Sequence, residues 1–402
     1  MRIAKLYVFF LGFICTAALS FGASTDITLD STHLRAHVNN LTGISCDVAA
    51  QRCLGVGFIS EGDSINHVVY RTQDGGYTWS KPIRLYSSIK TPMDKWSNRS
   101  MKVSCDDAGM LCHIAGSMRT HTKEYMFVST TYNGGLTWNR QRFLRKQNSF
   151  SSVTGLACGT WGEHCVIVGK DEGISGNSFV YTTDDMGQVW SKSRTLPKFK
   201  NKTERNDTQD ISCSDSGLVC TIVGGMEGYV QGAYVVKPIS YVTTDGGVTW
   251  SAPQILDQKN TTTPDSAPGV DEFSHVRCDN SGIKCTALRH SEILDNVVLT
   301  IVDVYSTVDS GLTWQKSGSL DNSDGNLYER IHAFDCTKDL KTCVAVHSPA
   351  GVQNSQSHAY LTHDSGRSWV HRELGFGTPD ESPAFLDLFC DNNAILCQIV
   401  GM

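Results

Sequence analysis

The stretch from Tyr70 to Trp79 reads YRTQDGGYTW, and the core of this motif returns five more times along the chain. The copies end at Trp79, Trp138, Trp190, Trp250, Trp314 and Trp369. Five positions before each Trp lies an Asp, or an Asn in the second copy: Asp74, Asn133, Asp185, Asp245, Asp309 and Asp364. The Asp side chain caps a tight turn, glycine supplies a positive φ, and the Trp ring packs between strands. Each copy therefore predicts a turn between two antiparallel strands.

A second motif, C-x6-C, alternates with the first and uses fourteen of the fifteen cysteines. The pairs are Cys46/Cys53, Cys105/Cys112, Cys158/Cys165, Cys213/Cys220, Cys278/Cys285, Cys336/Cys343 and Cys390/Cys397. Turn-forming residues lie inside each pair and apolar residues flank it, which is typical of a β-hairpin. Cysteines opposed across such a hairpin are close enough to bridge, so we expect seven local disulfides of about 2.5 kcal/mol each. The spacing does not suit zinc, and we expect no metal and no cofactor.

The six copies of the Tyr70–Trp79 motif resemble the Asp-box, or BNR, repeats of sialidases and other β-propellers. The resemblance implies an all-β fold of four-stranded blades in a single β-propeller domain over residues 24–402. Because there are seven cysteine hairpins but six Asp boxes, we expect seven blades. Residues Ile27 to Val38 would then complete the blade of the last hairpin and close the ring. Six blades are the alternative, if the terminal pieces extend another sheet.

The N-terminus predicts a secretory signal peptide over residues 1–23, with Arg2 and Lys5 preceding an apolar run from Leu6 to Leu19. This run is shorter than the roughly 20 residues needed to span a bilayer. We therefore expect a secreted protein, extracellular or periplasmic, which agrees with its cysteine use. A net charge of −6 without a long basic run argues against nucleic acid as a partner.

Function is expected on the face opposite the repeated turns, where the longer and more varied loops lie. Residues six positions before the first cysteine of a hairpin should meet at the channel mouth, and four of the seven are charged. With their neighbours they give the candidate site: Arg35, Arg99, Asp207, Glu272, Arg289, Tyr328 and Arg330. A ring of polar side chains is also what a hydrated channel mouth requires.

The resemblance to sialidases implies three arginines that hold a sugar carboxylate and a tyrosine nucleophile assisted by a glutamate. Arg35, Arg289 and Arg330 are the corresponding arginines, with Tyr328 and Glu272 in the other two roles. The family's Arg-Ile-Pro element is absent, and no aspartate stands out as the acid. We therefore expect a glycan- or protein-binding module without catalysis. The alternatives are a divergent sialidase-like glycoside hydrolase and an assembly or scaffolding propeller.

Overall fold

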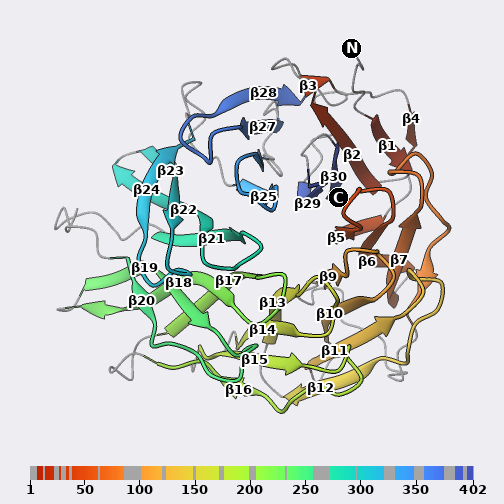
Figure 1. Cartoon of the computed structure of the whole chain (residues 1–402), viewed down its shortest axis with the longest axis horizontal. Helices are drawn as coiled ribbons and strands as arrows, with labels where there is room; N and C mark the ends of the chain where they lie inside the picture. Colours follow the sequence, from red (N-terminus) through yellow and green to blue (C-terminus); the bar gives the residue numbers. More distant parts are fainter. Residues whose placement is uncertain are drawn as a thin grey trace.

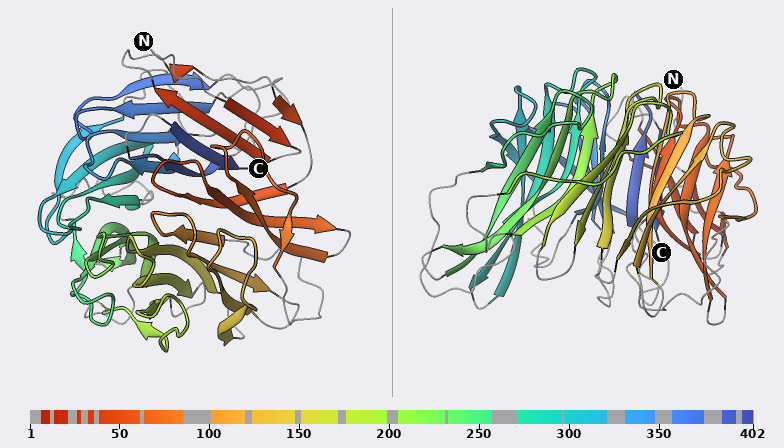
Figure 2. Two further views of the ribbon diagram at one scale, coloured as in Figure 1. Left: turned by 45° about the vertical axis from the view of Figure 1, so that its right-hand side comes forward. Right: turned by 90° about the horizontal axis from the view of Figure 1, so that it is seen from below.

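The protein is a ring of β-sheets around a central axis, as its computed structural model shows (Figure 1). The structure describes residues 7–11, 14–21, 27–28, 33–35, 39–61, 64–85, 101–119, 124–147, 151–171, 176–198, 205–230, 233–256, 271–295, 297–320, 331–347, 357–374, 385–392 and 396–401. The strands of successive sheets run along the axis of the ring, as the side view shows (Figure 2). Within these residues no helix is long and apolar enough to cross a bilayer.

Six sheets have four antiparallel strands each and form six propeller blades. Blade 1 is β5 (Asn39–Cys46), β6 (Cys53–Glu61), β7 (Ser64–Thr72) and β8 (Ile83–Arg84). Blade 2 is β9 (Met101–Cys105), β10 (Cys112–Arg119), β11 (Glu124–Thr131) and β12 (Arg142–Gln147). Blade 3 is β13 (Ser151–Cys158), β14 (Cys165–Asp171), β15 (Ser178–Thr183) and β16 (Arg194–Thr195).

The other three blades follow the same order, with the first strand of each innermost in the ring (Figure 1). Blade 4 is β17 (Arg205–Cys213), β18 (Cys220–Val230), β19 (Ala233–Thr243) and β20 (Gln254–Ile255). Blade 5 is β21 (Asp271–Cys278), β22 (Cys285–Asp295), β23 (Val297–Thr307) and β24 (Gln315–Ser319). Blade 6 is β25 (Ile331–Cys336), β26 (Cys343–His347), β27 (Ser357–Thr362) and β28 (Val370–Leu374).

The remaining sheet, here called the terminal sheet, lies between blades 6 and 1 and joins the two ends of the chain (Figure 1). Its strand order is β29 (Phe385–Cys390), β30 (Leu396–Gly401), β2 (Ile14–Phe21), β1 (Tyr7–Leu11) and β4 (His33–Arg35), and β3 (Ile27–Thr28) pairs with β2. Backbone amides tie it to its neighbours: Cys390 N donates to Asp335 Oδ2 (2.8 Å) and Ile44 N donates to Asp387 Oδ2 (2.9 Å).

The terminal sheet corrects the expected number of blades. Six four-stranded blades are present, and a seventh is not supported. The last cysteine hairpin, with Cys390 in β29 and Cys397 in β30, was expected to belong to that seventh blade, but it lies in the terminal sheet of six strands. The hairpin and its disulfide therefore form as predicted, whereas the sheet around them differs.

The strand that completes this sheet also differs from the expectation. Cys397 and Leu19 are register partners, so the strand beside β30 is β2, which lies within the predicted signal peptide. The strands of the expected segment, β3 and β4, lie farther out. The physical reason is that Ile14–Phe21 is a long apolar run that can pair with the open edge of β30. Removal of residues 1–23 stays a prediction.

The seven predicted disulfides are present, and each lies in the hairpin that joins the innermost strand of a sheet to the next strand outward. They join Cys46 to Cys53, Cys105 to Cys112, Cys158 to Cys165, Cys213 to Cys220, Cys278 to Cys285, Cys336 to Cys343 and Cys390 to Cys397. The two cysteines of each pair are register partners, and their Cα atoms are 4.0 or 4.1 Å apart. Such short separations are typical of non-hydrogen-bonded antiparallel pairs. The hairpin geometry therefore brings the cysteines together.

The cysteine turns and the Asp-box turns lie on one face of the ring, here called the turn face, because successive strands alternate in direction. The opposite face is called the loop face.

Backbone hydrogen bonds link neighbouring cysteine turns on the turn face. They join residues two positions after the first cysteine of each pair: Asn392 N to Val48 O, Val48 N to Asp107 O, Asp107 N to Thr160 O, Thr160 N to Asp215 O and Asp215 N to Asn280 O. Lys338 Nζ adds ion pairs with Asp107 and Asp215, each at 3.1 Å.

The hydrophobic cores lie between adjacent sheets. Leu54 and Val69 of blade 1, for example, form one buried cluster with Met101, Ile114 and Phe127 of blade 2. Each blade thus buries one face against each neighbour, as propellers require.

The Asp boxes are closed by the aspartate side chain, as expected. In the fourth box Asp245 Oδ1 accepts hydrogen bonds from Thr249 N (2.9 Å) and Thr243 Oγ1 (2.8 Å), and Asp245 Oδ2 accepts one from Thr249 Oγ1 (2.6 Å). In the second box Asn133 Oδ1 accepts from Thr137 N (2.9 Å) and Asn133 Nδ2 donates to Thr137 Oγ1 (2.7 Å). An amide therefore replaces the carboxylate with the same connectivity.

Replacement of Asp245 by Ala is expected to lower the free energy of unfolding by about 1–3 kcal/mol, because hydrogen bonds to a charged acceptor are lost. Asp245→Asn serves as the matched control and should retain most of the stability, since Asn133 already closes a box. Urea unfolding of the oxidised protein measures both effects. Equal losses in the two variants would contradict this account of the box.

Candidate functional site

Three of the predicted site residues have described side chains, and all three lie toward the loop face. Asp207 is in β17 and Glu272 is in β21, near the starts of two neighbouring innermost strands, while Arg289 is in β22. Arg99, Tyr328 and Arg330 lie outside the described residues. Arg35 lies in β4, where the structure describes the backbone alone. Whether the whole predicted set meets at one opening therefore stays a prediction.

Asp207 and Glu272 are joined through a residue that the sequence did not single out. Gln209 Nε2 donates to Glu272 Oε2 (3.0 Å) and lies 3.3 Å from Asp207 Oδ1. Lys170 Nζ, from β14, contacts Asp207 Oδ1 on the other side. Lys170, Asp207, Gln209 and Glu272, here called the loop-face row, span blades 3, 4 and 5. Glu272 is buried, with 5% of its surface exposed, whereas about a quarter of the Asp207 side chain (27%) is exposed.

A β-bulge positions Gln209. The register of β17 with β18 shifts between Thr208 and Asp210, which leaves Gln209 as the extra residue. The same shift occurs in β5, β13, β21, β25 and β29. A bulge bends its strand and re-aims a side chain, and bulges are frequent next to functional sites. Alternation of polar and apolar residues carries no signal for an extra residue, so the sequence pattern did not reveal Gln209.

Arg289 makes contacts other than those expected of an arginine that holds a ligand carboxylate. Its Nε and Nη2 donate to the two carboxylate oxygens of Asp271 (2.6 and 2.7 Å), and Asp303 Oδ2 is 3.7 Å from its Nη1. Burial acts to lower the pKa of Arg289, but the hydrogen bonds and charge of Asp271 raise it above its ordinary value. The bidentate face of this guanidinium is thus occupied within the protein.

A second group of charged residues lies deeper along the axis and was not predicted. Arg277 Nη1 donates to Asp210 Oδ2 (2.9 Å) and Arg277 Nε donates to Asp335 Oδ1 (2.7 Å). Asp387 and Lys102 complete the axial charge cluster, because the positive charges of Lys102 and Arg277 act to lower the pKa of the Asp387 carboxyl. These five residues lie one or three positions before the first cysteine of their hairpins.

The axial charge cluster ties neighbouring sheets together. Asp335 and Asp387 accept the backbone hydrogen bonds that anchor the terminal sheet, and Asp210 Oδ2 accepts one from Val276 N (3.1 Å). Burial raises the pKa of both Asp335 and Asp387, against the opposing effect of the nearby cations Arg277 and Lys102. Burial acts to lower the pKa of Arg277, but Asp210 and Asp335 raise it above its usual range. These contacts give the cluster a structural role.

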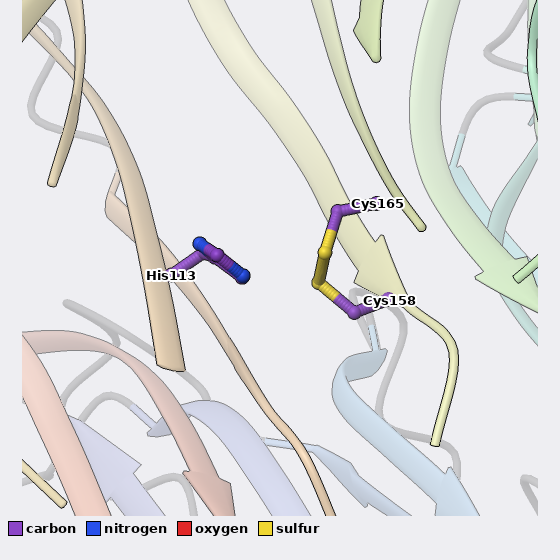
Figure 3. Close-up of side chains that lie close together, drawn as sticks. All are labelled: His113, Cys158 and Cys165. Atoms are coloured by element: carbon purple, nitrogen blue, oxygen red, sulfur yellow. A yellow bond between two sulfur atoms is a disulfide. The ribbon is translucent and has the colours of Figure 1, made fainter. Parts of the chain in front are cut away.

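Among the residues that the structure describes, one cluster has the residue types of a metal site, namely His113, Cys158 and Cys165 (Figure 3). Its two sulfur atoms form a disulfide, so they are not thiolate ligands. His113 Nε2 lies 3.3 Å from Gly162 O, and His113 Nδ1 lies 3.0 Å from Thr130 Oγ1. Both ring nitrogens therefore have protein partners, and this group packs blade 2 against blade 3.

Comparison with known proteins identifies one of the boxes as a known repeat. The BNR/Asp-box repeat family model matches residues 241–252, the box that contains Asp245. The family model matches one of the six boxes, whereas the similar solved structures described next cover 81–91% of this chain. No curated protein sequence matches the chain.

The similar solved structures include two proteins named as enzymes and one named only as a propeller domain. A GH74 xyloglucanase from Xanthomonas campestris has a TM-score of 0.55 and 13% identity, over 90% of this chain and 51% of the other. An alpha-L-arabinanase from Penicillium chrysogenum has a TM-score of 0.52 and 10% identity, over 81% and 93%. The Cps50 (Swd1) propeller domain from Myceliophteria thermophila has a TM-score of 0.51 and 10% identity, over 91% and 97%. This chain spans about half the length of the xyloglucanase. At such identities the likeness shows the fold alone.

Proposed function

We propose that this propeller is a secreted glycan-binding module whose ligand contacts the loop-face row. The observation that carries the proposal is the hydrogen-bonded row of one amine, two carboxyl groups and one amide across three blades. Sugar hydroxyls both donate and accept hydrogen bonds, so they match carboxylates and a primary amide at close spacing. The names of two similar folds, a xyloglucanase and an arabinanase, support a carbohydrate ligand.

The charge of the row favours a neutral sugar over a sialylated one. It contains two carboxyl groups against a single amine, and Arg289 is already paired with Asp271. A sugar carboxylate would meet like charge at this place. The expected ligand is therefore a neutral glycan rather than the sialic acid suggested by the family resemblance.

Binding of the oxidised protein to an array of neutral and sialylated glycans tests the proposal. Glu272→Gln is expected to weaken binding of a neutral glycan at least tenfold, because it loses the charged acceptor of the row. Glu163→Gln is the matched control, since Glu163 is an exposed residue of a cysteine turn on the opposite face. Preference for sialylated glycans, or equal binding by both variants, would overturn the proposal.

Glycoside hydrolysis is the second candidate, and one observation favours it. The carboxylates of Asp207 and Glu272 both contact the same amide nitrogen, so the two contacting oxygens are no more than about 6 Å apart. Retaining glycosidases hold their carboxyl groups about 5–5.5 Å apart. Mass spectrometry of a neutral glycan library incubated with the protein decides between the candidates. Sugar release that is abolished in both Asp207→Asn and Glu272→Gln would establish an enzyme. Glycans that remain intact would exclude hydrolysis and favour the binding module.

A further inference from the structure

Exposed apolar side chains occur on the turn face, the side of the ring opposite the proposed glycan site. Of the fourteen large apolar residues exposed in the described part of the chain, all but Ile255 and Val370 lie in cysteine turns or Asp-box turns. Val308 and Trp161 are the most exposed, at 73% and 74%. Single exposed apolar residues are ordinary, but on this face they are available for contact with a partner.

A pocket of about 200 Å³ opens on this face between blades 1 and 2. Two arginines, Arg52 and Arg71, line it together with the apolar side chains of Met110 and Leu136. Arg71 Nε donates to Gly134 O (3.0 Å), which holds its guanidinium against the turn of the next blade. The pocket thus combines two cations with an apolar wall in a volume suited to a few side-chain atoms.

The charge of this pocket sets it apart from the equivalent places in other blades. It has no acidic residue in its lining, and the box that borders it contains Asn133 where the other five boxes have Asp. In blade 5 the positions of Arg52 and Arg71 are taken by Lys284 and Ser306. Blade 1 alone has arginine at both of these positions.

We propose that the turn face docks a partner protein and that the pocket receives an acidic side chain next to an apolar one from that partner. Two guanidinium groups recognise a carboxylate, while Met110 and Leu136 cover the apolar neighbour. An anionic lipid surface fits less well, because the aspartates of the other five boxes lie on the same face and would repel it.

The rigidity of the turn face favours docking. Five backbone hydrogen bonds link successive cysteine turns, and Lys338 bridges two of these turns through Asp107 and Asp215. Each cysteine turn is also closed by its own disulfide. A surface that is already ordered loses little conformational entropy when a partner binds.

Fluorescence anisotropy with two labelled, end-capped hexapeptides tests the proposal on the full oxidised chain. One peptide alternates leucine with aspartate and the other alternates leucine with asparagine. We expect binding of the aspartate peptide, at least tenfold weaker binding of the asparagine peptide, and at least tenfold weaker binding of the aspartate peptide to Arg52→Glu and to Leu136→Asp.

Two matched variants lie at the equivalent positions of blade 5, namely Lys284→Glu and Leu312→Asp, and these should bind like the unaltered protein. Equal weakening in the blade 5 variants, or no preference for the aspartate peptide, would overturn the proposal. Binding of anionic phosphatidylserine vesicles in place of the peptide would also overturn it. Glycan binding by Arg52→Glu should be unchanged, so this test is independent of the proposed glycan site.

Discussion

Replacement of Arg277 by Leu is expected to lower the free energy of unfolding by up to about 3–5 kcal/mol, because it removes one partner from a largely buried network of charges. Arg277 pairs with Asp210 at 2.9 Å and with Asp335 at 2.7 Å. Without it, the two carboxylates remain in a buried place with no guanidinium to compensate them. Asp335 also accepts the amide of Cys390, so the loss should loosen the contact between blade 6 and the terminal sheet.

Urea unfolding at pH 7 under oxidising conditions measures this loss. Arg142→Leu is the matched control, because Arg142 is exposed on an outer strand and donates one hydrogen bond, to Gln188 O. The control should change the free energy of unfolding by less than about 1 kcal/mol. A loss in Arg277→Leu no larger than in the control would show that the axial charge cluster does not stabilise the ring.

The second large effect expected is a loss of stability in mild acid through buried histidines. Burial lowers the pKa of His67 and of His113 to about 4, from an ordinary value of 6.5. Burial, together with the charges of Arg277 and Lys102, lowers the pKa of His275 to about 3. Between pH 6.5 and 4 the unfolded chain therefore binds more protons than the folded protein. The stability from these neutral rings is complete above pH 6.5 and is lost as the pH falls toward the folded-state values.

Comparison of unfolding at pH 7 and pH 4.5 isolates one of these histidines. His67→Phe keeps an aromatic ring against Phe127, whose centroid is 4.8 Å away, but removes the titration. The difference in unfolding free energy between the two pH values should shrink by about 2 kcal/mol in this variant. Phe127→Leu is the control, because it disturbs the same packing but keeps the histidine. In this variant the difference in unfolding free energy between pH 7 and pH 4.5 should be the same as in the unaltered protein. An unchanged pH difference in His67→Phe would exclude His67 as a source of acid sensitivity.

The repeats predicted much of the fold because each motif is a local structure. The box from Thr243 to Trp250 and the hairpin from Cys213 to Cys220 are defined by turn residues within ten positions, so neighbours along the chain determine them. The blade count differed because the pairing of β2 with β30, which sets Leu19 opposite Cys397, joins opposite ends of the chain. No local pattern encodes such a pairing, and an apolar N-terminal run has the same composition in a signal peptide as in a strand.

The candidate site was predicted only in part, and the bulge explains the difference. Asp207 and Glu272 were chosen by counting back from the first cysteine, which places them near the start of their strands. The extra residue of the bulge selects Gln209 as the link between them, and a count that assumes strict alternation misses it. Arg277 and Asp335 were missed for another reason. Their pairing depends on how far neighbouring blades are staggered, which the sequence of one blade does not specify.

The repetition of the turns predicts a structural role for the turn face and places the expected function on the loop face. The boxes do have that role, but the residues between their fixed positions differ from blade to blade. Arg52, Arg71 and Asn133 come together only because blades 1 and 2 are adjacent. Comparison of equivalent positions across the repeats, rather than of the motifs themselves, is the signal that would have identified this pocket.

The disulfide pattern also bears on how the chain is made. Each bond joins a cysteine to the next cysteine along the chain, seven positions away. During synthesis, both members of a pair are present long before the following pair is made. Native pairing is then simply pairing in order of appearance, although even eight cysteines allow 105 connectivities in principle. A chain so arranged can oxidise pair by pair in an oxidising environment, with little need for an isomerase to exchange partners.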